Sequence, residues 1–343
     1  MTKLIKLKAG DKVAILSPSF AAPGIFPEVY ELGLKRLRDI FQLEPVEFPT
    51  TRKLGASTEE RAKDLITAFE NKEIKGVIAS IGGNDQVTYI KNLPSEPFTK
   101  NPKPFYGFSD NSHFMNFLWL NGIPSFYGGS VMTQLAMQKQ MDDFTVEYLK
   151  KAFFESGEVE IRTSKKFNEI GLSWADVSNL DKKRKYESNN GWFWDGSSNA
   201  KGILWGGCLE SVDEMLRNGV DIPSLNDFKN VILMIESSEE IPSVDYVHRV
   251  CRAFGERGIL EQVRGVLVGR PKAWEFDKPQ DKKLRKKYRE DQRKMILKTI
   301  HKYNPNIPVI QNLDFGHTDP QIAMPYGGRC KIDSGSQKIV VEF

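Results

Sequence analysis

The chain has few cysteines, and the three that it has lie far apart. Cys208, Cys251 and Cys330 form no CxxC pair among the 343 residues. This usage is typical of a reducing compartment and argues against a disulfide framework or a zinc cluster. We therefore expect a cytoplasmic protein whose core holds together without disulfides.

Long uninterrupted apolar segments and a strong excess of one charge are also missing. Lysines and aspartate break the N-terminal apolar stretch, so no signal-peptide core is expected there. The most apolar long window, 114–132, contains Asn116, Asn121, Gly122 and Pro124, which argues against a membrane span. Lys plus Arg total 49 and Asp plus Glu total 45, a net charge of +4. So small an excess indicates neither a nucleic-acid nor a membrane partner.

What remains is an ordinary globular composition, with 40% hydrophobic and 27% charged residues. The length favours two domains. We place an N-terminal domain at 1–165, a linker or flap at 166–200 and a C-terminal domain at 201–343. The middle segment is polar and carries Trp174, Trp192 and Trp194.

The N-terminal part alternates short apolar runs with segments of helical periodicity. Apolar runs at 13–16, 75–81 and 104–108 predict buried strands, and 57–60 matches a capping box before a helix. This alternation is typical of parallel βαβ units, whose ligands bind at the carboxyl ends of the strands. The loops expected at that edge are 17–22, 82–86 and 107–111.

The second half predicts further strands at 202–207, 231–235 and 263–268, with a helix at 244–258. A run dense in mixed charge, 278–294, follows them. We interpret it as a solvated helix face, because a nucleic-acid patch needs aromatic residues interleaved along an exposed strip.

Ser109 follows the predicted strand directly and precedes a helix, in the order Gly107-Phe-Ser-Asp-Asn111. A nucleophile needs such a placement, because the turn exposes its hydroxyl and the helix N-terminus favours a developing anion. Asn111 stands where the usual GxSxG elbow has its second glycine. A plain helix N-cap is the alternative for this serine.

A serine nucleophile requires a base and an orienting carboxylate. Of the four histidines, His317 lies in a polar loop after a strand-like run, whereas the others are interpreted as surface or packing residues. Glu236 stands at the carboxyl end of the apolar run 231–235. The sequence leaves two roles open for Glu236, catalysis and helix capping.

A glycine turn, Gly82-Gly-Asn-Asp85, ends another predicted strand. The phosphate-binding patterns GxGxxG and GxxxxGK[ST] are both absent. The backbone N–H of Gly83 can instead form half of an oxyanion hole, with the N–H of Asp110 as the other half. A simple tight turn is the third interpretation.

Taken together and in this order, the motifs resemble the LD-carboxypeptidase family of serine peptidases, which includes the microcin C self-immunity proteins. The resemblance covers nearly the whole chain. It rests on DKVAILSPS (11–19), IGGND (81–85), YGFSD (106–110), GG (206–207), IE (235–236), GVLVG (265–269) and FGHTDP (315–320).

The resemblance implies an α/β fold, with a flavodoxin-like parallel-sheet N-terminal domain and a smaller β-rich C-terminal domain. It implies a cytoplasmic homodimer and metal-free hydrolysis without a cofactor. The implied catalytic triad is Ser109, Glu236 and His317. The family often has asparagine after the glycine pair, where this chain has Cys208, so a substrate contact at that position is open.

Two substrate classes follow from the resemblance, and neither is a nucleic acid or a membrane. The immunity type cleaves an amide-like link between a peptide or aminoacyl group and a nucleotide. The recycling type releases the terminal D-alanine of murein tetrapeptides. Substrate contacts are predicted at Asn84, Trp174, Trp192, Trp194 and Cys208, and the tryptophan-bearing loop favours the immunity type, because aromatic rings stack on adenine.

Packing of these tryptophans at a domain interface is the alternative to substrate stacking. A non-catalytic small-molecule binding protein on the same scaffold is the alternative to an enzyme.

Overall fold

The computed structural model describes residues 1–219 and 221–343 and divides them into two compact units. Unit 1 comprises Met1–Ser156, Leu172–Arg184 and Gln321–Gly327. Unit 2 comprises Gly157–Gly171, Lys185–Pro320 and Gly328–Phe343. Each unit is therefore assembled from three segments of the chain, and the polar middle segment contributes to both.

Unit 1 is built on a six-stranded sheet in the order β14-β5-β4-β3-β1-β2. All neighbouring strands are parallel except β14, which runs antiparallel to β5. The strands are β1 (Lys12–Leu16), β2 (Glu44–Glu47), β3 (Ile74–Ala79), β4 (Phe105–Gly107), β5 (Ser125–Tyr127) and β14 (Met324–Tyr326).

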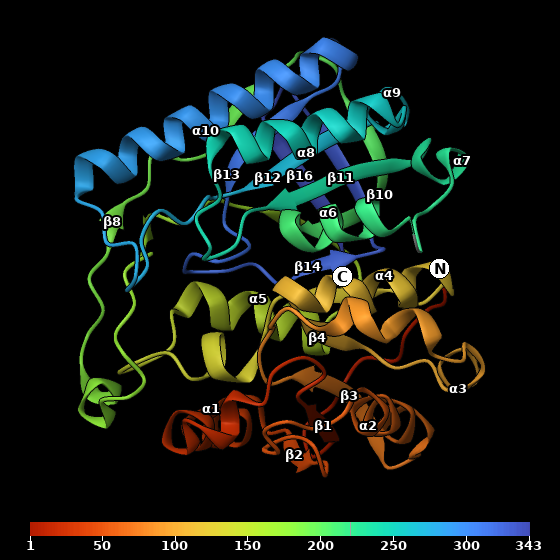
Figure 1. Ribbon diagram of the computed structural model, residues 1–343, viewed down its shortest axis with the longest axis vertical. Coiled ribbons are helices and arrows are strands. Elements are labelled where there is room, and N and C mark those ends of the chain that lie inside the picture. Colours follow the sequence, from red (N-terminus) through yellow and green to blue (C-terminus); the bar gives the residue numbers. More distant parts are fainter. Residues whose placement is uncertain (220) are drawn as a thin grey trace. The chain divides into compact units, whose positions relative to one another are not determined.

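Helices connect the parallel strands of unit 1, as the alternating pattern predicts (Figure 1). The capping box expected at 57–60 is present, because the Ser57 side chain accepts from the Glu60 N–H while the Glu60 side chain accepts from the Ser57 N–H. The helices are α1 (Pro27–Phe41), α2 (Thr58–Glu70), α3 (Glu96–Lys100), α4 (Ser112–Leu120) and α5 (Asp143–Phe154). Short single turns are η1 (Ala22–Gly24), η2 (Gln86–Thr88), η3 (Ile90–Asn92), η4 (Ser109–Asn111), η5 (Val131–Leu135) and η6 (Val177–Asp181).

Unit 2 is built on an eight-stranded mixed sheet in the order β6-β16-β15-β10-β11-β12-β13-β9. Its strands are β6 (Glu158–Ile161), β9 (Phe193–Asp195), β10 (Ala200–Cys208), β11 (Val231–Glu236), β12 (Gly265–Gly269), β13 (Val309–Leu313), β15 (Arg329–Asp333) and β16 (Lys338–Glu342). A separate pair joins β7 (Lys166–Phe167) to β8 (Glu187–Ser188). The predicted fold class, a parallel-sheet α/β N-terminal part with a β-rich C-terminal part, is confirmed.

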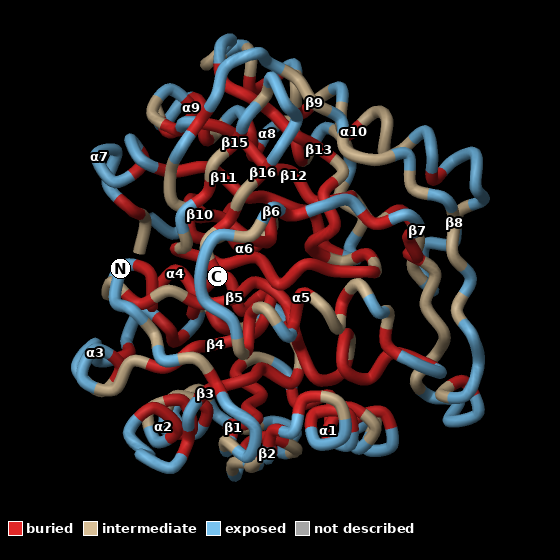
Figure 2. Tube along the Cα trace, turned by 180° about the vertical axis from the view of Figure 1, so that it is seen from behind, coloured by how far each residue is buried: buried red, intermediate tan, exposed pale blue. Residues whose placement is uncertain are grey.

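The centre of this sheet is the core of unit 2. Strands β11 and β12 are buried along their whole lengths (Figure 2), as their continuous apolar sequences predict. The helices of the unit are α6 (Leu209–Asn218), α7 (Leu225–Phe228), α8 (Val244–Glu256), α9 (Ile259–Gln262) and α10 (Lys282–Tyr303). None of the helices described in either unit is long and apolar enough to span a bilayer.

The charged run forms the first part of α10, and Lys282, Lys283, Lys286 and Lys287 on it are exposed as predicted. Arg285 differs, because its side chain is buried. It pairs at 2.5 Å with both Glu169 and Glu187, and a buried arginine requires such partners. A residue spacing typical of a solvated helix does not reveal a single buried cation.

Candidate active site

Ser109 lies on a strained turn at the carboxyl end of β4. It opens the short turn η4, which leads directly into α4. Its φ of 63° is in the left-handed region, which is uncommon for a residue other than glycine. Its backbone N–H donates to the Tyr127 hydroxyl at 3.2 Å. Backbone strain of this kind collects at functional sites and is typical of a serine on a nucleophile turn.

The glycine turn after β3 lies against this serine. A Cβ on Gly82 would be 2.8 Å from the Ser109 Cβ, 3.0 Å from its Oγ and 3.4 Å from the Asp110 nitrogen. A Cβ on Gly83, whose φ is +145°, would be 2.2 Å from the Ser19 Oγ. The two glycines therefore allow three loops of unit 1 to approach more closely than side chains would permit.

Side chains of the Ser109 turn tie it to the glycine loop. The Asp110 carboxylate accepts the N–H groups of Asp85 and Gln86, each at 3.1 Å. The Asn111 amide accepts from the Gln86 side chain at 2.9 Å and donates to the Phe108 carbonyl at 2.8 Å. Asn111, the departure from the glycine of the usual elbow, thus supplies bonds that hold the turn in place.

Arg61 organises the loop after β1 and was not identified from the sequence. Its buried guanidinium donates to the Ser19 carbonyl at 2.9 Å and forms an ion pair with Asp85. A cavity of about 170 Å³ opens beside these groups, and Arg61, Asp85 and Ser19 are part of its lining. Asn84, a predicted substrate contact, is exposed on the neighbouring loop.

In unit 2, Glu236 and His317 meet. The Glu236 side chain is fully buried at the end of β11, and its Oε2 lies 2.8 Å from the His317 Nδ1. Glycines make room for this contact: a Cβ on Gly316 would be 2.4 Å from the Glu236 Oε2, and one on Gly269 would be 2.6 Å from the Glu236 Cβ. The carboxylate therefore orients the imidazole through one nitrogen.

The other ring nitrogen of His317 has a carboxylate partner as well. Its Nε2 lies 2.9 Å from the Oε2 of Glu239. Burial alone would lower the pKa of His317, but the charges and hydrogen bonds of Glu236 and Glu239 outweigh it and raise the pKa to about 10. The Glu239 side chain is half-exposed. Partial desolvation of its carboxylate opposes ionisation, yet the adjacent His317 lowers the pKa of Glu239 to about 2.

A buried ion pair supports the histidine loop. The Arg270 guanidinium donates to Asp314 at 2.6 Å and to the Thr318 hydroxyl at 3.2 Å, so it contacts the loop on both sides of His317. Asp314 also accepts the N–H and the hydroxyl of Ser164. Arg270 and Asp314 are 1% and 0% exposed, so each charge depends on the other for compensation.

Cys208 lies beside Glu236. The two residues are partners in the register of the parallel strands β10 and β11. The thiol donates to Glu210 at 3.4 Å, and Glu210 in turn accepts the N–H and the hydroxyl of Ser238. Burial, reinforced by Glu210 and Glu236, raises the pKa of Cys208 well above its ordinary value, so this thiol is no nucleophile at neutral pH.

The three tryptophans have different surroundings. Trp174, in unit 1, packs edge-on against Phe26 with ring centroids 5.6 Å apart. In unit 2, the Trp192 indole donates to Asp314 at 3.3 Å, and Trp194 pairs with Ile310 through β9 and β13. All three are half-buried. The rings of Trp192 and Trp194 lie against each other with centroids 6.4 Å apart, so both have packing roles within their unit.

The structure thus brings the predicted residues together in two groups. Ser109, Asp110 and Gly83 belong to one group, in unit 1; Glu236, His317 and Cys208 belong to the other, in unit 2. The sequence reasoning missed three charged residues, Arg61, Glu239 and Arg270. Glu239 had one signal, its position three residues after the strand-ending Glu236, but neither arginine had any.

Comparison with known proteins decides the family. The family profile of the LD-carboxypeptidase N-terminal domain matches residues 13–128, and that of the LD-carboxypeptidase C-terminal domain matches residues 201–332. The chain belongs to the LD-carboxypeptidase family. The N-terminal profile covers the group of site residues in unit 1, and the C-terminal profile covers the group in unit 2.

Individual relatives of this LD-carboxypeptidase family member extend over most of the chain. A Treponema pallidum protein with a provisional carboxypeptidase name is 28% identical, over 100% of this chain and 95% of the relative. The microcin C7 self-immunity protein MccF of Escherichia coli is 23% identical, over 84% of this chain and 79% of MccF. An MccF-like protein from Streptococcus pneumoniae, solved in complex with AMP, is 27% identical with a TM-score of 0.84, over 97% and 98%. These similarities support carboxypeptidase or amidase activity.

Proposed function

We propose that the chain is a serine carboxypeptidase or amidase in which Ser109 is the nucleophile, His317 the general base and Glu236 the residue that orients His317. The observation that carries the proposal is the contact between the His317 Nδ1 and the buried Glu236. It occupies Nδ1 and orients the ring, so that proton transfer falls to Nε2.

The chemistry follows the established logic of serine hydrolysis. His317 Nε2 takes the proton of the Ser109 hydroxyl as its oxygen attacks the scissile carbonyl. The N–H groups of Gly83 and Asp110 stabilise the oxyanion, and loss of one such donor reduces turnover by roughly 10²–10³-fold. His317 then gives the proton to the leaving amine, and water releases the acyl-enzyme.

Glu239 sets a condition on this mechanism. In the structure its carboxylate accepts from the nitrogen that has to take the serine proton, and the raised pKa keeps His317 protonated at neutral pH. A protonated imidazole cannot act as a base. Turnover therefore requires Glu239 to release Nε2. Glu239 is exposed, whereas Glu236 is buried, so Glu239 is the carboxylate that can move.

For the substrate, we propose an amide bond between a peptide or aminoacyl group and a nucleotide. What supports it is the likeness to the S. pneumoniae protein solved with AMP. Of the tryptophans, Trp174 is our candidate for stacking on a base, because the Trp192 indole donates to Asp314 and the Trp194 ring lies against that of Trp192. Release of D-alanine from murein tetrapeptides is the second candidate, favoured by the match to both family profiles.

Labelling with a fluorophosphonate tests the nucleophile without knowledge of the substrate. We expect stoichiometric labelling of the wild type, none of Ser109→Ala, and unchanged labelling of Ser95→Ala, a serine of the exposed turn before α3. A non-catalytic binding protein would not be labelled at Ser109 and would replace this proposal. The homodimer, the cytoplasmic location and the absence of a cofactor stay predictions.

A further inference from the structure

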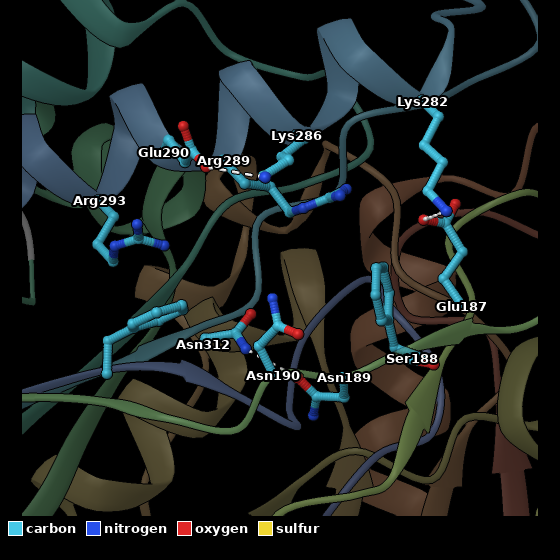
Figure 3. A pocket seen from close by; sticks show the side chains of 12 residues that line it. Glu187, Ser188, Asn189, Asn190, Lys282, Lys286, Arg289, Glu290, Arg293 and Asn312 are labelled. Atoms are coloured by element: carbon cyan, nitrogen blue, oxygen red, sulfur yellow. Dashed lines mark hydrogen bonds and ion pairs between the residues drawn. The ribbon is translucent and has the colours of Figure 1, made fainter.

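A second cavity lies wholly within unit 2 and includes neither Glu236 nor His317. It has a volume of about 470 Å³ and lies between α10 and the segment that carries β8 and β9 (Figure 3). Small-molecule sites have cavities of roughly 300–1,000 Å³. The cavity is therefore large enough for a ligand of the size of a nucleotide.

The cavity wall formed by α10 carries four cationic side chains. Lys282, Lys286, Arg289 and Arg293 all line the cavity, and their spacing of three or four residues places them on one face of the helix. Figure 3 shows their side chains along the same edge of the cavity. The charged run noted in the sequence thus has two faces. One face is solvated, and the face with Lys282, Lys286, Arg289 and Arg293 lines the cavity.

Carboxylates compensate these cations only in part. Lys282 lies 3.8 Å from Glu187, and Lys286 lies 3.9 Å from Glu290. Both are long ion-pair distances, and both lysines are largely exposed. Arg289 pairs with the buried Glu169, which also serves Arg285. Four cationic and two acidic side chains line the cavity, so its lining carries an excess of positive charge.

Arg293 has no carboxylate within ion-pair distance among the residues that the structure describes. Its guanidinium stacks over the Phe193 ring, with 3.8 Å from its central carbon to the ring centroid. Stacking occupies the face of a guanidinium and leaves its N–H edge available for an oxyanion. Burial lowers the pKa of Arg293, an effect that Glu290 only partly offsets and that a bound anion would reverse.

The opposite wall supplies a neutral donor, the side-chain amide of Asn190. Asn312 and Asn190 line the cavity, and the Asn190 side chain is exposed and points toward α10 (Figure 3). The Asn312 amide nitrogen already donates to the Asn189 side chain at 3.0 Å and to the Gly191 carbonyl at 2.7 Å, so Asn312 shapes this wall and Asn190 supplies the donor. An amide donor opposite arginine and lysine is typical of sites that bind phosphate or carboxylate oxygens.

We propose that this cavity is a binding site for a small oligoanion, a molecule that carries two or more phosphate or carboxylate groups. Arg293 and Lys286 bind it from α10, and Asn190 binds it from the opposite wall. The site is additional to the proposed hydrolytic centre, and its test does not depend on hydrolysis.

Isothermal titration calorimetry of the full chain with tripolyphosphate and, separately, with citrate tests the site. We expect one site per chain for at least one probe, and a loss of affinity of about tenfold or more in Arg293→Gln and in Lys286→Gln. Lys283→Gln is the matched control, since it removes the same charge from the same helix outside the cavity. It should bind as the wild type does.

The two probes distinguish the sources of the anion. Binding of tripolyphosphate alone assigns the site to phosphate groups, and binding of citrate alone assigns it to carboxylates. Absence of binding for both probes overturns the proposal. So does an equal loss in Lys283→Gln, because it would mean non-specific attraction to α10. Tighter binding of an oligothymidylate, weakened equally by all three variants, would replace the cavity with a nucleic-acid surface.

Discussion

His317 Nε2 lies 2.9 Å from Glu239, an acceptor on the nitrogen that serine hydrolysis needs for proton transfer. The opposite nitrogen lies 2.8 Å from Glu236. The buried contact orients the ring, and the exposed one keeps it protonated. The raised pKa of His317 therefore favours the protonated imidazole, and the proposed mechanism requires Glu239 to leave Nε2.

Glu239→Gln should shift the pH dependence of hydrolysis. The mutation removes one of the two carboxylates that raise the His317 pKa, so the pKa falls from about 10 toward its ordinary value. Because His317 has to be neutral to act as a base, the acidic limb of the kcat/KM profile should move to lower pH. The measurement is a pH–rate series, with the exposed neighbour Glu240→Gln as control. An unmoved limb, or the same shift in the control, would refute the role of Glu239.

Glu236→Gln should reduce kcat strongly while it leaves KM and the fold nearly unchanged. Glutamine retains the shape of the side chain but removes the charge that stabilises the His317 cation, and the expected loss is roughly 10³–10⁴-fold. Steady-state kinetics and a thermal melt measure the two effects. A variant with wild-type kcat would show that the contact of Glu236 with His317 has no catalytic role.

Gly82→Ala tests the close packing of the glycine loop on Ser109. The new methyl group would lie 2.8 Å from the Ser109 Cβ and 3.0 Å from its Oγ, so one of the two turns has to shift. Displacement of a reacting group by about 1 Å costs on the order of 100-fold in rate. We expect that loss in kcat/KM and slower fluorophosphonate labelling.

Gly335→Ala is the matched control for Gly82→Ala. At that position the nearest atom to an added Cβ is the Asp333 Oδ1 at 3.5 Å, an ordinary contact. This variant should keep wild-type rates. Unchanged labelling in Gly82→Ala would mean that the loop yields without cost and does not hold the nucleophile.

Arg270→Met should destabilise the protein, because it leaves the Asp314 charge buried and unpaired. The expected loss is about 3–5 kcal/mol in the free energy of unfolding. The comparison is Arg249→Met, whose ion pair with Asp245 is 67% exposed on both sides and should contribute about 0–1 kcal/mol. Urea denaturation measures both. Equal effects of the two variants would contradict the structural role assigned to Arg270.

Much of the fold could be predicted because its signals are local. The capping box at Ser57, the apolar run that ends at Glu236 and the strand before Ser109 each depend on a few adjacent residues. Parallel topology then places the ends of such strands at one edge of a sheet. For this reason the glycine turn and the Ser109 turn could be expected side by side before the structure was known.

Contacts between distant parts of the chain could not be predicted in this way. Strand β14 pairs with β5 across the whole of the intervening unit 2 sequence, and β9 adds a polar segment to the edge of a sheet. Arg270 and Asp314 look like surface residues in the sequence but are fully buried as a pair. Their burial depends on tertiary packing, which no local pattern encodes.

The measurement that tests the central claim most directly is a side-by-side hydrolysis assay of the wild type and Ser109→Ala. The substrates are an aminoacyl sulfamoyl-adenylate and a murein tetrapeptide that ends in D-alanine. We predict cleavage of the adenylate by the wild type and a loss of roughly 10⁴-fold or more in Ser109→Ala. Cleavage of the tetrapeptide alone would leave the serine mechanism and change the substrate. Full activity of Ser109→Ala would contradict the mechanism itself.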